Sequence, residues 1–128
     1  MAVVLVVDDE FGIVKLLEEV LEDEGYQVLV AANGRQALEQ AAKDKPALII
    51  TDFMMPVMNG AELIKALAAD ARLSDIPIIL ISSVPEAMVA ERIAGYTAFV
   101  RKPFNIFDLI DLVAKLSGGA SPNPGQGD

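Results

Sequence analysis

The 128-residue chain contains no cysteine, no histidine and no tryptophan. Without cysteine it can form neither a disulfide nor a thiolate site for zinc or an iron–sulfur cluster. Without histidine it cannot carry a Ser-His-Asp triad, a histidine-ligated haem or the usual side chain for proton transfer near neutral pH. Chemistry in this chain therefore has to rely on carboxylates, hydroxyls, lysine and hard metal ions.

Basic residues and long apolar runs are also scarce. Ten Lys and Arg residues stand against 19 Asp and Glu, a net charge of −9, which argues against nucleic acid or an anionic membrane as a direct partner. No apolar run approaches the roughly 18 residues that span a bilayer, and the start of the chain lacks the pattern of a signal peptide. We therefore expect a cytoplasmic protein. The hydrophobic content of 53% is sufficient for the core of a single domain.

Short aliphatic runs alternate five times with stretches of helical periodicity. The predicted strands are residues 3–7, 27–31, 47–51, 78–82 and 98–101. The predicted helices lie near residues 10–24, 34–43, 60–71, 86–94 and 105–116. This alternation predicts a doubly wound α/β domain, a flavodoxin-like (βα)5 sandwich with a parallel sheet, over residues 1–117. The Gly/Pro-rich segment 118–128 is predicted to be a disordered tail or linker.

Polar side chains follow four of the five predicted strands, where ligands bind in open α/β sheets. Asp8 and Asp9 follow the first strand, Asp52 the third and Lys102 the fifth, and Ser82 ends the fourth. With a strand order of 2-1-3-4-5, the three aspartates become neighbours. Crowded carboxylates repel one another unless a cation neutralises them, and Mg²⁺ suits oxygen ligands.

The same residues are suited to phosphoryl chemistry. An aspartate has an ordinary pKa near 4, so it can act as a nucleophile at neutral pH without a general base. Lys102 and a metal ion can balance the charge of a transferring phosphoryl group. The cluster therefore predicts a magnesium-dependent phosphoryl site that needs no histidine.

These motifs together resemble the receiver domain of two-component response regulators, with a chemotaxis-regulator-like pattern over about residues 3–117. The pieces that carry the resemblance are Asp8-Asp9-Glu10, the run DFMMPVMNG over residues 52–60, Ser82, and Lys102-Pro103-Phe104. The resemblance implies a phosphorylation-activated signalling protein and not an enzyme, apart from its own self-phosphorylation and autodephosphorylation. The implied partners are a sensor histidine kinase or a histidine phosphotransfer protein, and an unknown downstream protein. It also allows a phosphorylation-dependent homodimer.

The resemblance also implies a role for each site residue. Asp52 would accept the phosphoryl group. Asp9 would bind Mg²⁺ directly, Asp8 largely through water, and Met54 through its backbone carbonyl.

On the opposite side of the site, Lys102 would contact the phosphoryl oxygens and Ser82 would be the switch hydroxyl. Phe99 occupies the aromatic switch position, and the Lys102–Pro103 peptide bond would be cis.

Three positions depart from the family pattern. Phe99 stands where the family commonly has tyrosine, so signalling through a phenolic hydroxyl at that position is excluded. The stretch between Ser82 and Lys102 is shorter than usual, which predicts a short or shifted fourth helix. Asn59 replaces an acidic residue and is predicted to cap a helix.

Several simpler interpretations stay open at this stage. Asp8 and Asp9 could cap the first helix, and Phe99 could be ordinary core. Phe11 could lie exposed beside the site or pack under the first helix. A phosphorylation-independent, receiver-like interaction module is the main functional alternative. A haloacid-dehalogenase-like phosphatase is disfavoured because Met54 stands where its second acid is required. Whether the chain is a stand-alone regulator or part of a larger protein stays undecided.

Overall fold

The computed structural model describes residues 2–117, so the tail predicted for residues 118–128 lies outside the described residues. Five strands, β1 to β5, alternate with five helices, α1 to α5. The strands are Val3–Val7, Gln27–Ala31, Leu48–Asp52, Ile78–Ser82 and Ala98–Arg101. The helices are Phe11–Asp23, Gly34–Lys43, Gly60–Ala69, Glu86–Ala90 and Ile106–Leu116. Within residues 2–117 no helix is long and apolar enough to cross a membrane.

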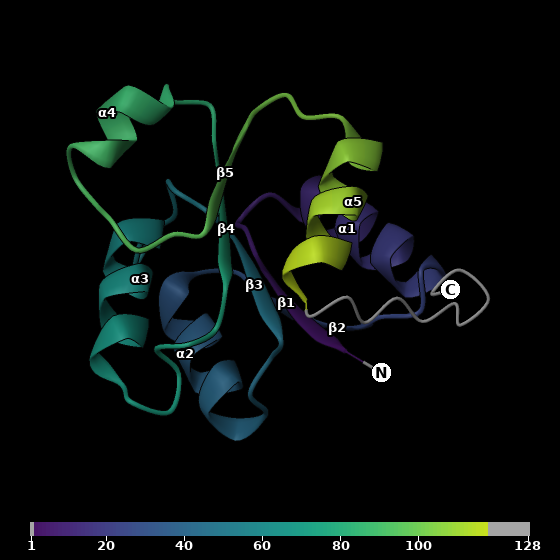
Figure 1. The fold of residues 1–128 in the computed structure, drawn as a ribbon, viewed down its shortest axis with the longest axis horizontal. Coiled ribbons are helices and arrows are strands. Elements are labelled where there is room, and N and C mark those ends of the chain that lie inside the picture. Colours follow the sequence, from purple (N-terminus) through teal and green to yellow (C-terminus); the bar gives the residue numbers. More distant parts are fainter. Residues whose placement is uncertain (1, 118–128) are drawn as a thin grey trace.

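The strands form one parallel sheet in the order β2-β1-β3-β4-β5, which confirms the predicted fold class and strand order. Helices α1 and α5 cover one face of the sheet, and α2, α3 and α4 cover the other (Figure 1). β1, β3 and β4 lie between neighbours on both sides; β1 and β4 are almost continuous aliphatic runs, and β3 begins with three aliphatic residues. Strands covered on both faces need apolar side chains on both, which explains this pattern.

Alternate residues of each strand feed two separate core layers. Leu5 and Ile49 pack with the α2–α3–α4 layer, and Val6 and Ile50 pack with the α1–α5 layer. Because successive side chains of a strand point to opposite faces, both layers are filled from the same strands. The result is a sheet packed on both faces, whose carboxyl edge carries the polar residues Asp8, Asp52 and Ser82.

Most helix boundaries follow local signals in the sequence. Asn59 caps α3 and forms a reciprocal capping box with Glu62, as predicted for its departure from the family pattern. α1 ends just before Gly25, which has a positive φ of 93°. α4 spans five residues only, Glu86–Ala90, where the sequence predicted a helix near 86–94. The structure thus agrees with the expectation of a short fourth helix.

Candidate functional site at the carboxyl edge of the sheet

The carboxyl ends of β1, β3, β4 and β5 bring the predicted polar residues to one place. Asp52 is the last residue of β3 and Ser82 the last of β4, and both are buried. Asp8 follows β1 directly and is also buried. The backbone N–H of Lys102 donates to the carbonyl of Ser82 at 2.8 Å, which places the lysine beside the end of β4. Residues nearly 100 positions apart in the chain therefore share one site.

The Lys102 ammonium lies at the centre of three carboxylates. Its Nζ is 3.4 Å from Asp52 Oδ2, 3.5 Å from Asp8 Oδ2 and 3.3 Å from Glu10 Oε1. The lysine side chain is only 16% exposed. Asp52 and Asp8, which were predicted site residues, thus converge on the predicted lysine, and Glu10 joins them.

The remaining carboxylate oxygens are held by backbone donors. The N–H of Phe53 donates to Asp52 Oδ1 at 2.9 Å, and the N–H of Glu10 donates to Asp8 Oδ1 at 2.9 Å. Each buried aspartate therefore has one oxygen fixed by the backbone and the other facing Lys102. These contacts hold both side chains in one orientation at the edge of the sheet.

Burial and the nearby charge of Asp8 together raise the pKa of Asp52 from 3.8 to about 6, against the opposing effects of Lys102 and the N–H of Phe53. Burial also raises the pKa of Asp8, partly offset by the hydrogen bond from Glu10 and the charge of Lys102. For Lys102, burial favours the neutral amine, but the surrounding carboxylates outweigh it and raise its pKa. At neutral pH the site therefore holds excess negative charge around one cation.

That excess charge and the oxygen donors fit a hard divalent cation. One carboxylate oxygen from each of Asp8, Glu10 and Asp52, called the acidic cluster below, lies within 4.8 Å of the others. Mg²⁺ prefers such oxygen ligands and commonly binds through one or two carboxylates while keeping several waters. The acidic cluster therefore has the donor chemistry of a magnesium site.

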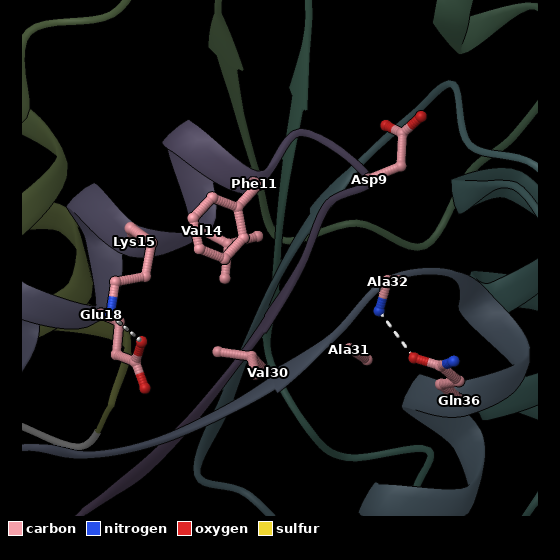
Figure 2. Close-up of a pocket in the computed structure, with 9 residues that line it drawn as sticks. All are labelled: Asp9, Phe11, Val14, Lys15, Glu18, Val30, Ala31, Ala32 and Gln36. Carbon is pink, nitrogen blue, oxygen red and sulfur yellow. Dashed lines mark hydrogen bonds and ion pairs between the residues drawn. The ribbon is translucent and has the colours of Figure 1, made fainter.

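Two predicted metal ligands, Asp9 and Met54, are not members of the acidic cluster. Asp9 is exposed and does not belong to the cluster, and Figure 2 shows its carboxylate directed away from Val30 and Lys15 at the pocket between α1 and β2. Met54 is 59% exposed, and its predicted role depends on its backbone carbonyl and not on its side chain. Phe11 is 77% exposed beside the site, which excludes its packing under α1.

The predicted switch residues lie on the side of the site next to α4. Ser82 Oγ accepts a hydrogen bond from the N–H of Val84 at 2.9 Å, which leaves its own proton free to donate elsewhere. Phe99 is half-buried against the α2–α3–α4 core layer. Its ring centroid is 6.1 Å from that of Tyr96, and the Tyr96 hydroxyl donates to Glu86 Oε2 of α4 at 3.0 Å. An aromatic pair thus connects β5 to α4.

Two of these residues were missed from the sequence. Glu10 was noted only as part of an acidic triplet, although a third acid at the end of a buried strand was a signal that it lies near the site. Tyr96 gave no signal, because its contact depends on the path of the short connection between α4 and β5.

The Lys102–Pro103 peptide bond is cis, as the resemblance implied.

A carboxylate cluster facing one lysine, at the carboxyl edge of a 2-1-3-4-5 sheet, is the arrangement of a two-component signalling domain. The model of the response regulator receiver domain matches residues 4–114. The chain belongs to this family, whose members act as signalling switches and not as classical enzymes.

Among curated proteins, the chain is 36% identical to sporulation initiation phosphotransferase F of Bacillus subtilis (strain 168), over 88% of this chain and 90% of that protein. Other curated relatives are longer. The chain spans about half the length of those named as transcriptional regulators, such as the ycf29 proteins of Pyropia yezoensis (51%) and Porphyra purpurea (54%).

Solved structures of related proteins match this chain over more than nine-tenths of its length. The signal receiver domain of a histidine kinase from Syntrophus aciditrophicus matches with a TM-score of 0.85 and 33% identity, covering 94% of this chain and 92% of that one. The response regulator protein TrrA of Thermotoga maritima, solved in complex with Mg²⁺–BeF, matches with a TM-score of 0.81 and 34% identity, covering 91% and 99%. One of these similar structures is thus a response regulator protein solved in complex with Mg²⁺–BeF.

Proposed function

We propose that this domain is a phosphorylation-activated switch in which Asp52 accepts a phosphoryl group from a phosphohistidine of a partner kinase or phosphotransfer protein. The observation that carries the proposal is the position of the Asp52 carboxylate, buried at the end of β3 with Oδ2 at 3.4 Å from Lys102 Nζ. A P–O bond forms at Asp52 while the P–N bond of the donor breaks, and the donor imidazole keeps the electron pair. With a pKa of about 6, Asp52 is mostly ionised at neutral pH and needs no general base.

Lys102 has the charge and position to stabilise the transferred group. Its ammonium already lies 3.4 Å from Asp52 Oδ2, so it can balance charge on the phosphoryl oxygens without moving far. The proposed magnesium ligands are Asp8 and Asp52 of the acidic cluster, together with Asp9 and the backbone carbonyl of Met54. Glu10, the third member of the cluster, is assigned to Lys102 and not to the metal. Bound Mg²⁺ would offset the negative charge shared by the carboxylates and the phosphoryl group.

The proposed output is a change in the face formed by α4, β5 and α5, which a downstream protein reads. Ser82, whose proton is free, would donate to the phosphoryl group. Movement of Ser82 would make room for Phe99, and the contact of Phe99 with Tyr96 gives a direct route to Glu86 of α4. The same altered face could support a phosphorylation-dependent homodimer.

The test is incubation with Mg²⁺ and acetyl phosphate, followed by intact-protein mass spectrometry. We expect a gain of one phosphoryl group in the wild type and none in Asp52→Asn. Asp75→Asn is the matched control, because Asp75 is an exposed aspartate paired with Lys45 away from the site. An unlabelled wild type, under conditions that label another receiver domain, would instead favour a phosphorylation-independent interaction module.

A further inference from the structure

Glu10 uses its side chain for the site and not for its own helix. It occupies the N-cap position of α1, yet its carboxylate makes no capping hydrogen bond. Glu10 Oε1 instead accepts a hydrogen bond from Lys102 Nζ at 3.3 Å, across 92 positions of sequence. The Glu10 carboxylate is therefore free of the first turn of α1 and available to Lys102.

The contact affects the lysine that the proposed phosphorylation requires. An ammonium has three N–H donors, and Lys102 faces three carboxylates at 3.3–3.5 Å. A phosphoryl group on Asp52 would need at least one of these donors. Asp8 and Asp52 have side chains only 3% and 9% exposed, whereas Glu10 is 60% exposed. The Glu10 carboxylate is already largely in water, whereas the other two are held in the protein. Glu10 is therefore the carboxylate that can leave Lys102 most easily.

The exposed carboxylate also lines the same surface pocket as Lys102 and Ser83. A phosphodonor is anionic, so one that reaches Lys102 through this pocket also meets the negative charge of Glu10. Like charges separated by a few ångströms repel, even near water, and the repulsion grows with the charge of the donor. Glu10 therefore opposes donors in proportion to their negative charge.

We propose that Glu10 sets the donor preference of the site: it competes with the phosphoryl group for Lys102 and disfavours strongly anionic donors. This inference rests on the proposed phosphorylation of Asp52. Removing the charge should change rates by about two- to fivefold, the range that corresponds to an exposed ion pair. Because the interaction is exposed, it should weaken as ionic strength rises.

The experiment compares wild type, Glu10→Gln and Glu22→Gln in their rates of phosphorylation at saturating Mg²⁺. Glu22 is an exposed acid of the same helix, twelve residues further on or about 18 Å along the axis, so it provides the same change in net charge away from the site. Two small donors are used, acetyl phosphate and phosphoramidate, because phosphoramidate carries less negative charge at neutral pH. Each series is repeated at low and high salt.

We expect Glu10→Gln to react about two- to fivefold faster than wild type with acetyl phosphate at low salt. The gain should be smaller with phosphoramidate and at high salt, and Glu22→Gln should match the wild type. Equal rates for Glu10→Gln and wild type with both donors would overturn the inference. A slower Glu10→Gln that needs more Mg²⁺ would also overturn it, because Glu10 would then be a metal ligand. Failure of the proposed function looks different, since the wild type would then be unlabelled by either donor.

Discussion

Asp52 is buried, whereas the proposed phosphorylation requires its carboxylate to be ionised, and these two properties oppose each other. Burial and the neighbouring Asp8 favour the neutral acid, while Lys102 and the N–H of Phe53 favour the carboxylate. The first pair prevails and raises the pKa to about 6. A carboxylate that is more basic than usual and oriented by fixed donors is suited to nucleophilic attack. Keeping it ionised in the folded protein, however, lowers the stability of the native state.

That cost in stability depends on pH in a defined direction. A raised pKa means that the native state holds the proton more tightly than the unfolded chain, so the favourable contribution is complete below about pH 3.8 and is lost as pH rises through about 6. Asp52→Asn removes the ionisation. We expect it to be more stable than the wild type by about 1–3 kcal/mol near neutral pH in metal-free buffer, with the difference shrinking towards pH 4. Urea denaturation across this pH range measures the difference.

Asp75→Asn provides the control for this titration. The Lys45 ammonium lowers the pKa of Asp75 through a hydrogen bond at 2.9 Å and through its charge. The sign is therefore opposite, and the variant should gain no stability at neutral pH. If both variants gained equally, the effect would come from reduced net negative charge and not from the environment of Asp52.

At the scale of elements, the site depends on how closely α3 approaches the end of β3. The N–H of Gly60, the first residue of α3, donates to the carbonyl of Phe53 at 2.9 Å. A Cβ on Gly60 would lie 2.5 Å from the carbonyl oxygen of Asp52 and 3.0 Å from the Cα of Phe53. Both neighbours are backbone atoms and cannot rotate away. The glycine thus permits the contact that fixes the backbone beside Asp52, the proposed phosphoacceptor.

The same substitution at two glycines should therefore have opposite effects. We expect Gly60→Ala to lose about 2–3 kcal/mol of stability, because the added methyl forces α3 away from β3. Gly12→Ala in α1 should gain up to about 1 kcal/mol, since nothing lies within 4 Å of its added Cβ and alanine favours the helix. Chemical denaturation of both variants checks the prediction. A neutral Gly60→Ala would show that the end of β3 shifts easily, and the acceptor would then not be rigidly placed.

The elements that could be predicted from sequence are those with strong local patterns. The aliphatic runs of β1 and β4 and the amphipathic stripe of α5 gave the correct boundaries to within a residue or two. α4 could not be bounded, because Val89 and Ile93 are both buried with helical spacing although the helix ends at Ala90. Val57 was also beyond prediction: its φ of 67° is rare for a β-branched residue and is imposed by the loop between β3 and α3.

Across the whole molecule, the strand order made the site predictable. Once β1, β3 and β4 are neighbours, Asp8, Asp52 and Ser82 must lie together at one edge, and Lys102 follows from β5. Sequence could not decide which of two successive acids faces inward, because successive side chains at a strand end point to different sides. The structure buries Asp8 and exposes Asp9. The sequence could not reveal Glu10 as a partner of Lys102 either, because that contact depends on how far a side chain at the start of a helix extends.

The charge balance of the site predicts a link between Mg²⁺ and the stability of the entire domain. A ligand that binds only the native state stabilises it by RT ln(1 + [L]/Kd), about 2.7 kcal/mol at a hundredfold excess over Kd. At neutral pH, Mg²⁺ should therefore raise the thermal midpoint in proportion to the logarithm of its concentration. The rise should fade as pH drops below about 6, because protonation of Asp52 competes with the cation.

Asp52→Asn should lose most of this rise in the thermal midpoint and Asp75→Asn should keep it, with sodium chloride of matched ionic strength as the reference. An equal rise in both variants would mean that Mg²⁺ acts only by screening the net charge of −9.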